Sequence, residues 1–263
     1  MSEEILKALM QLFAIVAKQD EGVEPTQIEY VKMFLEQQLT AEKVSEYFAL
    51  FEQHAGLRED EEQIKNRLTS VKDSVRILGL CKKINKTLTQ KQKVIALTRL
   101  FEIINADRKF TDQRMAILNT VAEVFNISQE EFRSIESFVV KNEPEELDNN
   151  HILIINDKPE RYQTAKKILS KHLDKNIFIL RVQSVDLYFL KYTGSEDIFL
   201  NGLPISNKRI YLFANGGTVK LTKGTPVYYS DVAAHFLADI TSSKISYTVK
   251  NLSFRFPNGN LNS

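Results

Sequence analysis

The amino-acid sequence predicts two domains of different classes: an all-α bundle built from two helical repeats, followed by a small, mainly-β sandwich with one helix. Apolar residues recur at helical spacing through residues 1–140, whereas the later segments are short, alternate in polarity and are separated by glycine turns. Residues 1–150 carry 20 Lys/Arg against 26 Asp/Glu, and residues 151–263 carry 15 against 8. The charge balance therefore changes from −6 to +7, which marks a boundary between two domains.

The composition narrows the class of protein before any motif is considered. The chain has 263 residues, of which 43% are hydrophobic and 26% charged, as in ordinary globular domains. Its single cysteine, Cys81, excludes an intramolecular disulfide and a cysteine-based zinc finger. No apolar run approaches the ~18 residues needed to span a bilayer, and the acidic N-terminus lacks the basic region of a signal peptide. We therefore expect a cytoplasmic protein with no membrane span.

The first part reads as six or seven helices, each with one wide apolar face. Pro25 is a favourable first-turn residue, Thr40 and Thr89 stand where helices open, and Ser128 with Glu131 forms a predicted capping box. Residues 56–66 are strongly charged, which favours a loop or a solvated helix start. The expected helices cover residues 5–16, 25–35, 40–51, 71–84, 89–104, 115–125 and 128–138.

An internal repeat lies within this bundle. Residues 15–35 parallel residues 102–122, with Asp20 aligned on Asp107 and Val31 on Leu118. Each copy reads as a helix, a short acidic turn, a second helix and a capped third helix. We expect the two copies to pack about a pseudo-two-fold axis and to share one core.

The turns of the two copies resemble those of the TerB-like family, whose mark is an Asp-Gly-x-hydrophobic-x-x-x-Glu sequence in each half. The resemblance implies a divalent cation held by the turn carboxylates, which suits hard cations. Both family Glu positions differ here, because Gln27 and Arg114 occupy them, and Arg114 places a positive charge where a cation needs a ligand. The alternative is that Asp20 and Asp107 simply brace the helix turns. The candidate metal ligands are Asp20, Glu24, Asp107 and Asp112.

The second part reads as strands around one helix, with a further helix near the end. A helix is expected from Pro159, with Tyr162, Ala165 and Ile168 on its apolar face. The expected strands cover residues 151–156, 177–182, 187–192, 197–202, 210–213, 218–221 and 225–229, and a helix is expected at 232–238. The predicted organisation is a helical domain at 1–142, a linker at 143–150, an α+β domain at 151–244 and an incomplete segment at 245–263.

Residues 194–202 and 211–220, with their Asn-Gly and Asn-Gly-Gly turns, resemble the later half of a forkhead-associated domain. The resemblance implies a β-sandwich. In that family an Arg and a Ser on earlier loops bind phosphothreonine, and neither residue can be placed by motif here. Phosphopeptide binding therefore does not carry over with the resemblance, and a phosphopeptide-binding module built on residues 176–230 stays open only as an alternative function.

The last segment, residues 246–262, resembles the opening strand of an ABC-type ATPase domain, which places Phe256 at the position that stacks on adenine. No Gly-x-x-x-x-Gly-Lys phosphate-binding loop occurs in the chain. The order of domains resembles the N-terminal region of ABC transporter ATP-binding proteins of Bacteroidetes-type bacteria. This implies ATP and Mg²⁺ in a longer parent protein, an ATPase and a membrane domain as partners in cis, and the cytosolic face of the inner membrane. The alternative is a plain C-terminal strand of the second domain.

No catalytic constellation is evident in the sequence. The four histidines are scattered without metal-ligand spacing, and no nucleophile elbow or dinucleotide-binding loop is present. We expect a chain without cofactor or catalysis: a sensor and docking region that works through protein–protein contacts, without nucleic-acid binding. The other class of function kept open is a stand-alone, tellurite-resistance-type cation-binding stress protein.

Overall fold

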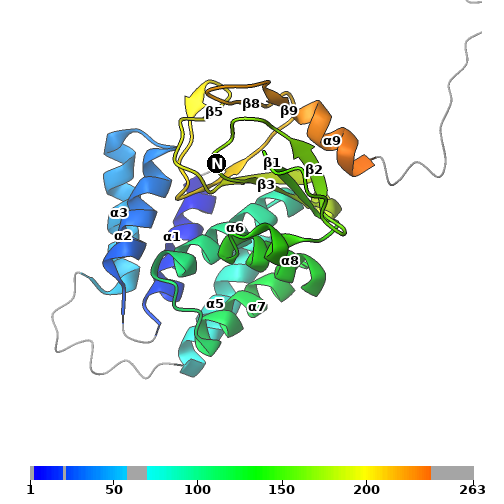
Figure 1. Ribbon diagram of the computed structural model, residues 1–263. Helices are drawn as coiled ribbons and strands as arrows, with labels where there is room; N and C mark the ends of the chain where they lie inside the picture. Colours follow the sequence, from blue (N-terminus) through cyan, green and yellow to red (C-terminus); the bar gives the residue numbers. More distant parts are fainter. Residues whose placement is uncertain (1–2, 20–21, 58–69, 238–263) are drawn as a thin grey trace, which may run out of the picture.

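The structure is a computed structural model, and it describes residues 3–19, 22–57 and 70–237. A helical part occupies one side of the molecule and a β-rich part the other (Figure 1). The predicted fold class is therefore confirmed. No helix in these ranges is long and apolar enough to cross a membrane.

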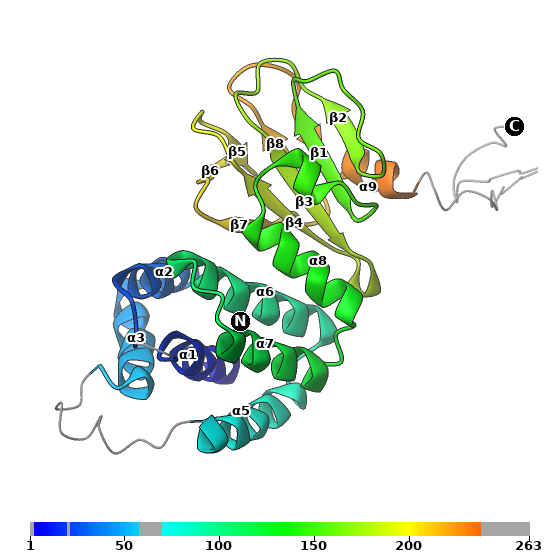
Figure 2. The ribbon, with the colours of Figure 1, turned by 60° about the horizontal axis from the view of Figure 1, so that its bottom comes forward.

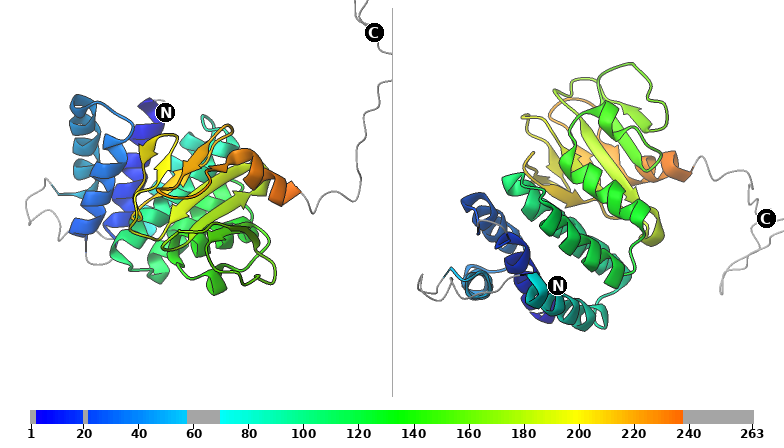
Figure 3. Two further views of the ribbon diagram at one scale, coloured as in Figure 1. Left: turned by 45° about the horizontal axis from the view of Figure 1, so that its top comes forward. Right: turned by 90° about the horizontal axis from the view of Figure 1, so that it is seen from below.

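The helical part contains seven α-helices within the described ranges, which follow the predicted ranges closely. Two groups of three, α1–α3 and α6–α8, correspond to the two copies of the predicted repeat, and α5 joins them. Figure 3 shows α1, α2 and α3 side by side at one end of the bundle. The helices are α1 (Glu3–Ala17), α2 (Pro25–Glu36), α3 (Ala41–Ala55), α5 (Ser70–Asn85), α6 (Gln90–Asp107), α7 (Asp112–Val124) and α8 (Gln129–Val140).

Helix starts follow from local capping chemistry. The hydroxyl of Thr111 accepts the amide N–H of Arg114, and the hydroxyl of Ser128 accepts that of Glu131 at 3.2 Å. The capping box predicted at Ser128 is only half formed, because the Glu131 carboxylate instead accepts the amide N–H of Ser184 at 3.1 Å. The residue expected to close the box thus links α8 to the β-rich part.

The β-rich part consists of two sheets. A mixed five-stranded sheet has the order β2-β1-β3-β4-β7, and a four-stranded sheet has the order β6-β5-β8-β9. The elements are η1 (Pro144–Leu147), β1 (Ile152–Asn156), β2 (Lys166–Leu169), β3 (Ile177–Val182), η2 (Gln183–Val185), β4 (Leu187–Tyr192), β5 (Phe199–Leu200), β6 (Leu203–Pro204), β7 (Ile210–Leu212), β8 (Thr218–Lys220), β9 (Val227–Tyr228) and α9 (Tyr229–Leu237).

The central strands β1, β3 and β4 of the five-stranded sheet are buried on both faces, and the period of two along a strand divides their side chains between two cores. Ile152 and Ile154 on β1 join the apolar core of the helices, whereas Leu153 and Ile155 join the core under the four-stranded sheet and α9. Helix α8 lies along the first of these faces (Figure 2). The helical and β-rich parts therefore share one continuous apolar core.

The helix expected from Pro159 is wrong. Residues 166–169 form β2, which pairs in parallel with β1 so that Leu153 lies opposite Lys166. Before it, the carboxylate of Asp148 accepts the amide N–H groups of residues 163, 164 and 165 at 2.7–2.8 Å. These long-range bonds satisfy backbone groups that a helix would pair locally, so tertiary contacts override the helical spacing of the apolar residues.

The segment expected to be a linker, residues 143–150, is a packed joint. It holds the short helix η1, whose Leu147 is fully buried in the shared core. Asp148 then anchors the loop before β2. The expected strand at 245–263 lies outside the described residues, as does most of the charged segment 56–66.

Candidate functional site: the paired turns

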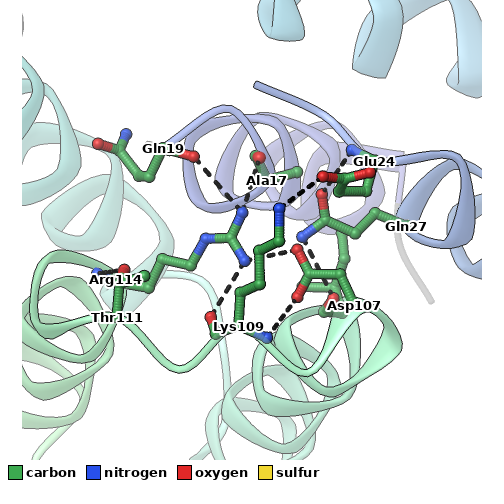
Figure 4. A network of polar contacts seen from close by, with 9 residues as sticks. Ala17, Gln19, Glu24, Gln27, Asp107, Lys109, Thr111 and Arg114 are labelled. Atoms are coloured by element: carbon green, nitrogen blue, oxygen red, sulfur yellow. Dashed lines mark hydrogen bonds and ion pairs between the residues drawn. The ribbon is translucent and has the colours of Figure 1, made fainter. Parts of the chain in front are cut away.

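The two repeat turns lie against each other, and polar side chains of both turns point toward one another (Figure 4). The first turn joins α1 to α2, and the second joins α6 to α7. The ammonium group of Lys109 in the second turn lies 2.7 Å from a carboxylate oxygen of Glu24 in the first. This hydrogen bond and the positive charge of Lys109 lower the pKa of Glu24 below its ordinary value.

Arg114, in the first turn of α7, is the centre of the site. Its side chain is 1% exposed, and its Nη1 atom donates to Oδ2 of Asp107 at 2.6 Å and to the carbonyl oxygen of Lys109 at 3.1 Å. The side chain of Asp107 is itself only 3% exposed. Its other oxygen, Oδ1, accepts the amide N–H of Lys109 at 2.9 Å. Both carboxylate oxygens of Asp107 are thus engaged by donors from within the chain.

The repeat makes a reciprocal pair of cross-links. Arg114 Nη2 donates to the carbonyl oxygens of Ala17 and Gln19, both at 3.4 Å, at the end of α1. Gln27, the aligned residue of the first copy, is fully buried, and its Nε2 atom donates to the carbonyl oxygen of Ile103 on α6 at 3.5 Å. Each copy therefore reaches into the first helix of the other from the same repeat position.

A second layer of amides extends the network from the turns. Gln113 donates to Oε1 of Gln19 at 2.6 Å, and Gln19 donates to the carbonyl oxygen of Ile15 at 2.7 Å. Gln19 is 4% exposed. These bonds connect the start of α7 to the last turn of α1. Gln113 and Arg114, which are adjacent in α7, therefore both bind the end of α1.

The side chains that the structure describes at these turns do not form a donor set that suits a divalent cation. Such ions bind several oxygens that are free to coordinate. Here Glu24 is paired with Lys109, Asp107 is paired with Arg114, and Asp112 is an exposed first residue of α7. Among the described residues no three His, Cys, Asp or Glu side chains cluster as metal ligands. The fourth candidate, Asp20, lies outside the described residues.

Comparison with known proteins bears on the helical part. Residues 6–137, half of the chain, match the family described as tellurite resistance protein TerB. The chain belongs to the TerB family. No curated protein and no solved structure matches the chain. The match ends within α8, so the β-rich part has no family assignment, and nothing in the comparisons names an ABC transporter or a forkhead-associated domain.

A second buried polar cluster fixes the TerB bundle to β7. Glu102 on α6 accepts a hydrogen bond from the Tyr30 hydroxyl at 3.1 Å and the amide N–H of Ile210 at 2.9 Å, and it pairs with Arg99. Arg99 also donates to the carbonyl oxygen of Ile210 at 2.9 Å. Burial raises the pKa of Tyr30 well above its ordinary value, as does the charge of Glu102.

Lys191 on β4 makes a second polar contact between the sheet and the TerB bundle, at the C-terminal end of α8. Its ammonium group donates to the carbonyl oxygens of Phe138 and Lys141 at the C-terminal end of α8, where a positive charge complements the helix dipole. Its side chain is buried, and burial lowers the pKa of Lys191 to about 7, although the nearby charge of Glu146 acts in the opposite direction. The TerB bundle and the sheet are thus joined by specific polar contacts as well as by apolar packing.

Sequence reasoning placed the turns correctly but missed how their residues pair. Arg114 was expected only to disfavour a cation, whereas it supplies the central cation of the site itself. The sequence signal that could have predicted this ion pair is the combination of an acidic residue at 107 and a basic residue at 114 in the same turn. Lys109 and Gln19 carried no such signal, because their partners lie in the other repeat. Phe256, the proposed adenine-stacking residue, lies outside the described residues.

Proposed function

We propose that this chain is a non-catalytic sensor and docking region. In it the guanidinium of Arg114 acts as an internal cation that holds the paired turns of the TerB domain together. The observation that carries the proposal is the buried ion pair between Arg114 and Asp107. An internal guanidinium needs no free cation, so the bundle keeps its shape whatever the concentration of divalent ions. A fixed shape suits a domain that serves as a platform for other proteins.

The energetics of burial support this assignment. A carboxylate as buried as Asp107 requires a compensating charge and hydrogen bonds. Arg114 supplies the charge, and its planar guanidinium presents several N–H donors in a fixed fork, whereas an ammonium group is a compact point charge with three donors. It spans Asp107 and the carbonyl oxygens of Ala17 and Gln19, so one side chain neutralises the acid and joins the two repeats.

Calorimetric titration of the purified chain tests this proposal against the cation-binding alternative. Calcium, magnesium, manganese and zinc are each titrated after treatment with a chelator. We expect no saturable heat and no change in unfolding temperature with any of them. A saturable site that disappears in the Asp20→Ala variant would instead support a cation-binding stress protein, and would contradict the internal-cation account.

The finer form of the proposal is that this region belongs to an ABC transporter ATP-binding protein. Its support is the sequence pattern of residues 246–262, with Phe256 at the adenine-stacking position. The test is the genomic reading frame after codon 263. A phosphate-binding loop within about thirty codons would support the proposal, and a stop codon would contradict it. The chain itself is expected to show no ATP turnover after repurification, and its partners are expected to be the ATPase and membrane domains in cis.

A further inference from the structure

A pocket of about 390 Å³ lies where the TerB bundle meets the β-rich part. Helices α2, α6 and α8 contribute to one side of it, and β4 with the residues leading into β7 contribute to the other. The volume falls within the range of small-molecule sites in proteins. Because both parts of the chain line the pocket, its shape depends on the junction held by Glu102 and Lys191.

The charged side chains lining the pocket are mostly cationic. Arg108, Lys191, Lys208 and Arg209 face two acids, Glu29 and Glu102. Glu102 is already neutralised by its buried ion pair with Arg99, and the buried ammonium group of Lys191 already donates to the end of α8. This leaves Glu29 to oppose three basic groups. Within the described part of the chain, the exposed side chains of Arg108 and Lys208 form no ion pair. The pocket therefore presents uncompensated positive charge to a ligand.

The pocket also offers an apolar surface. Tyr30 and Met33 of α2 line it together with Val139 of α8. The hydroxyl of Tyr30 is bonded to Glu102, which fixes the position of its ring. A ligand that used both kinds of surface would combine an anionic group with an apolar or aromatic body, since aromatic side chains contribute contact area at low entropic cost.

Arg108 itself adopts a backbone conformation that favours glycine. Its φ angle is 58°, in the left-handed region, at the C-terminal end of α6. Glycine is the usual residue there, because a Cβ atom is strained in this conformation. The guanidinium of Arg108 is thus placed at the pocket despite a conformational cost, directly after the buried Asp107.

We propose that this pocket binds a small organic phosphate, with the phosphate group at Arg108, Lys208 and Arg209 and the organic body against Tyr30 and Met33. A phosphate dianion matches the excess of guanidinium and ammonium groups, which bind such anions through charge-assisted hydrogen bonds. The site goes beyond the docking role proposed above, and it does not depend on whether a cation binds the paired turns.

The test is calorimetric titration at constant ionic strength with three probes: AMP, inorganic phosphate and adenosine. We expect saturable binding of AMP, weaker binding of inorganic phosphate and weaker binding of adenosine. The variants are Arg108→Gly and Lys208→Ala, each of which should weaken AMP binding about tenfold, as expected for the loss of one charged hydrogen bond. Arg108→Gly suits the left-handed backbone, so it should fold with an unfolding temperature no lower than that of the original chain.

Two control variants make the same kinds of substitution at residues that do not line the pocket. Asn126→Gly places glycine at another left-handed position, with φ 55°, and Lys220→Ala removes an exposed positive charge from β8. Both controls should bind AMP like the original chain. Absence of AMP and phosphate binding at about 10 mM, tenfold above a Kd of about 1 mM, would overturn the proposal. Equal losses in the control and test variants, or equal affinities for AMP and inorganic phosphate, would also overturn it.

Discussion

The guanidinium of Arg114 and the carboxylate of Asp107 lie 2.6 Å apart, and both side chains are almost completely buried between the two repeats. In the TerB-like pattern a glutamate occupies the position of Arg114, so both halves present carboxylates to their turns. In this chain Gln27 and Arg114 occupy these two positions, and Arg114 supplies a positive charge from the protein itself. The paired turns are consequently held by an internal salt bridge between the end of α6 and α7, and the same guanidinium joins α7 to the end of α1 through hydrogen bonds to carbonyl oxygens.

Removing one partner of this pair should destabilise the chain strongly. Arg114→Leu leaves Asp107 buried without a compensating charge, which typically costs about 3–5 kcal/mol in the free energy of unfolding. Urea denaturation measures the effect, with Arg133→Leu on the exposed face of α8 as the control, expected within about 0.5 kcal/mol. The double variant with Asp107→Leu should lose less than the sum of the single losses. Additive losses would show that the two side chains do not interact.

The junction between the TerB bundle and β7 should depend on the charge of Glu102. Glu102→Gln leaves one oxygen for three donors, from Tyr30, Arg99 and the amide of Ile210. We expect a loss of about 1.5–3 kcal/mol and faster hydrogen exchange at the amide of Ile210. Hydrogen exchange followed by NMR checks this, with Glu123→Gln on the exposed side of α7 as the control. An unchanged Ile210 amide would contradict the role assigned to Glu102.

The buried Lys191 predicts an alkaline rise in stability. Burial lowers the pKa of Lys191 in the folded chain to about 7, whereas the unfolded value is the model-peptide value near 10.4. Between these values the unfolded chain binds more protons than the folded chain, so the free energy of unfolding rises with pH. The slope is at most about 1.4 kcal/mol per pH unit.

The measurement compares urea denaturation of the original chain and of Lys191→Met from pH 6.5 to 10. Relative to the variant, the original chain should gain stability across this range and show little change below pH 7. Lys220→Met, which removes an exposed lysine on β8, should follow the original chain. Parallel curves for the original chain and Lys191→Met would show that Lys191 titrates normally.

The helices were predictable from sequence because their apolar faces repeat over several turns, and because Pro25, Thr89 and Ser128 begin helices through local chemistry. The paired turns were predictable as a repeat because the apolar and acidic positions of residues 15–35 align with those of residues 102–122. The loop and strand from 157 to 169 were not, because their backbone hydrogen bonds go to Asp148 and β1, which lie elsewhere in the chain.

The sequence predicted which residues lie in the paired turns, but it did not predict which of their charged groups pair with each other. The pattern identified residues 107 and 114 as the two marked positions of one turn, but it assigned Asp107 to a metal or to the bracing of a helix, and Arg114 only to the exclusion of a cation. The pairing of Lys109 with Glu24, and of Glu131 with Ser184, joins residues more than fifty positions apart. Such contacts follow from the packing of α6 against α2 and of α8 against the sheet, which no local pattern encodes.

The most direct test of the central claim reverses the charge of the internal cation. Thermal unfolding of the original chain and of Arg114→Glu is measured with a chelator and with millimolar calcium or magnesium, using Arg133→Glu as the matched control. We expect the unfolding temperatures of the original chain and of the control to be the same with and without the ions. Arg114→Glu should be destabilised with chelator and regain stability as the ion concentration rises, since an ion that binds only the folded state stabilises it by mass action. Stabilisation of the original chain by the ions, to the same extent as the variant, would contradict the account.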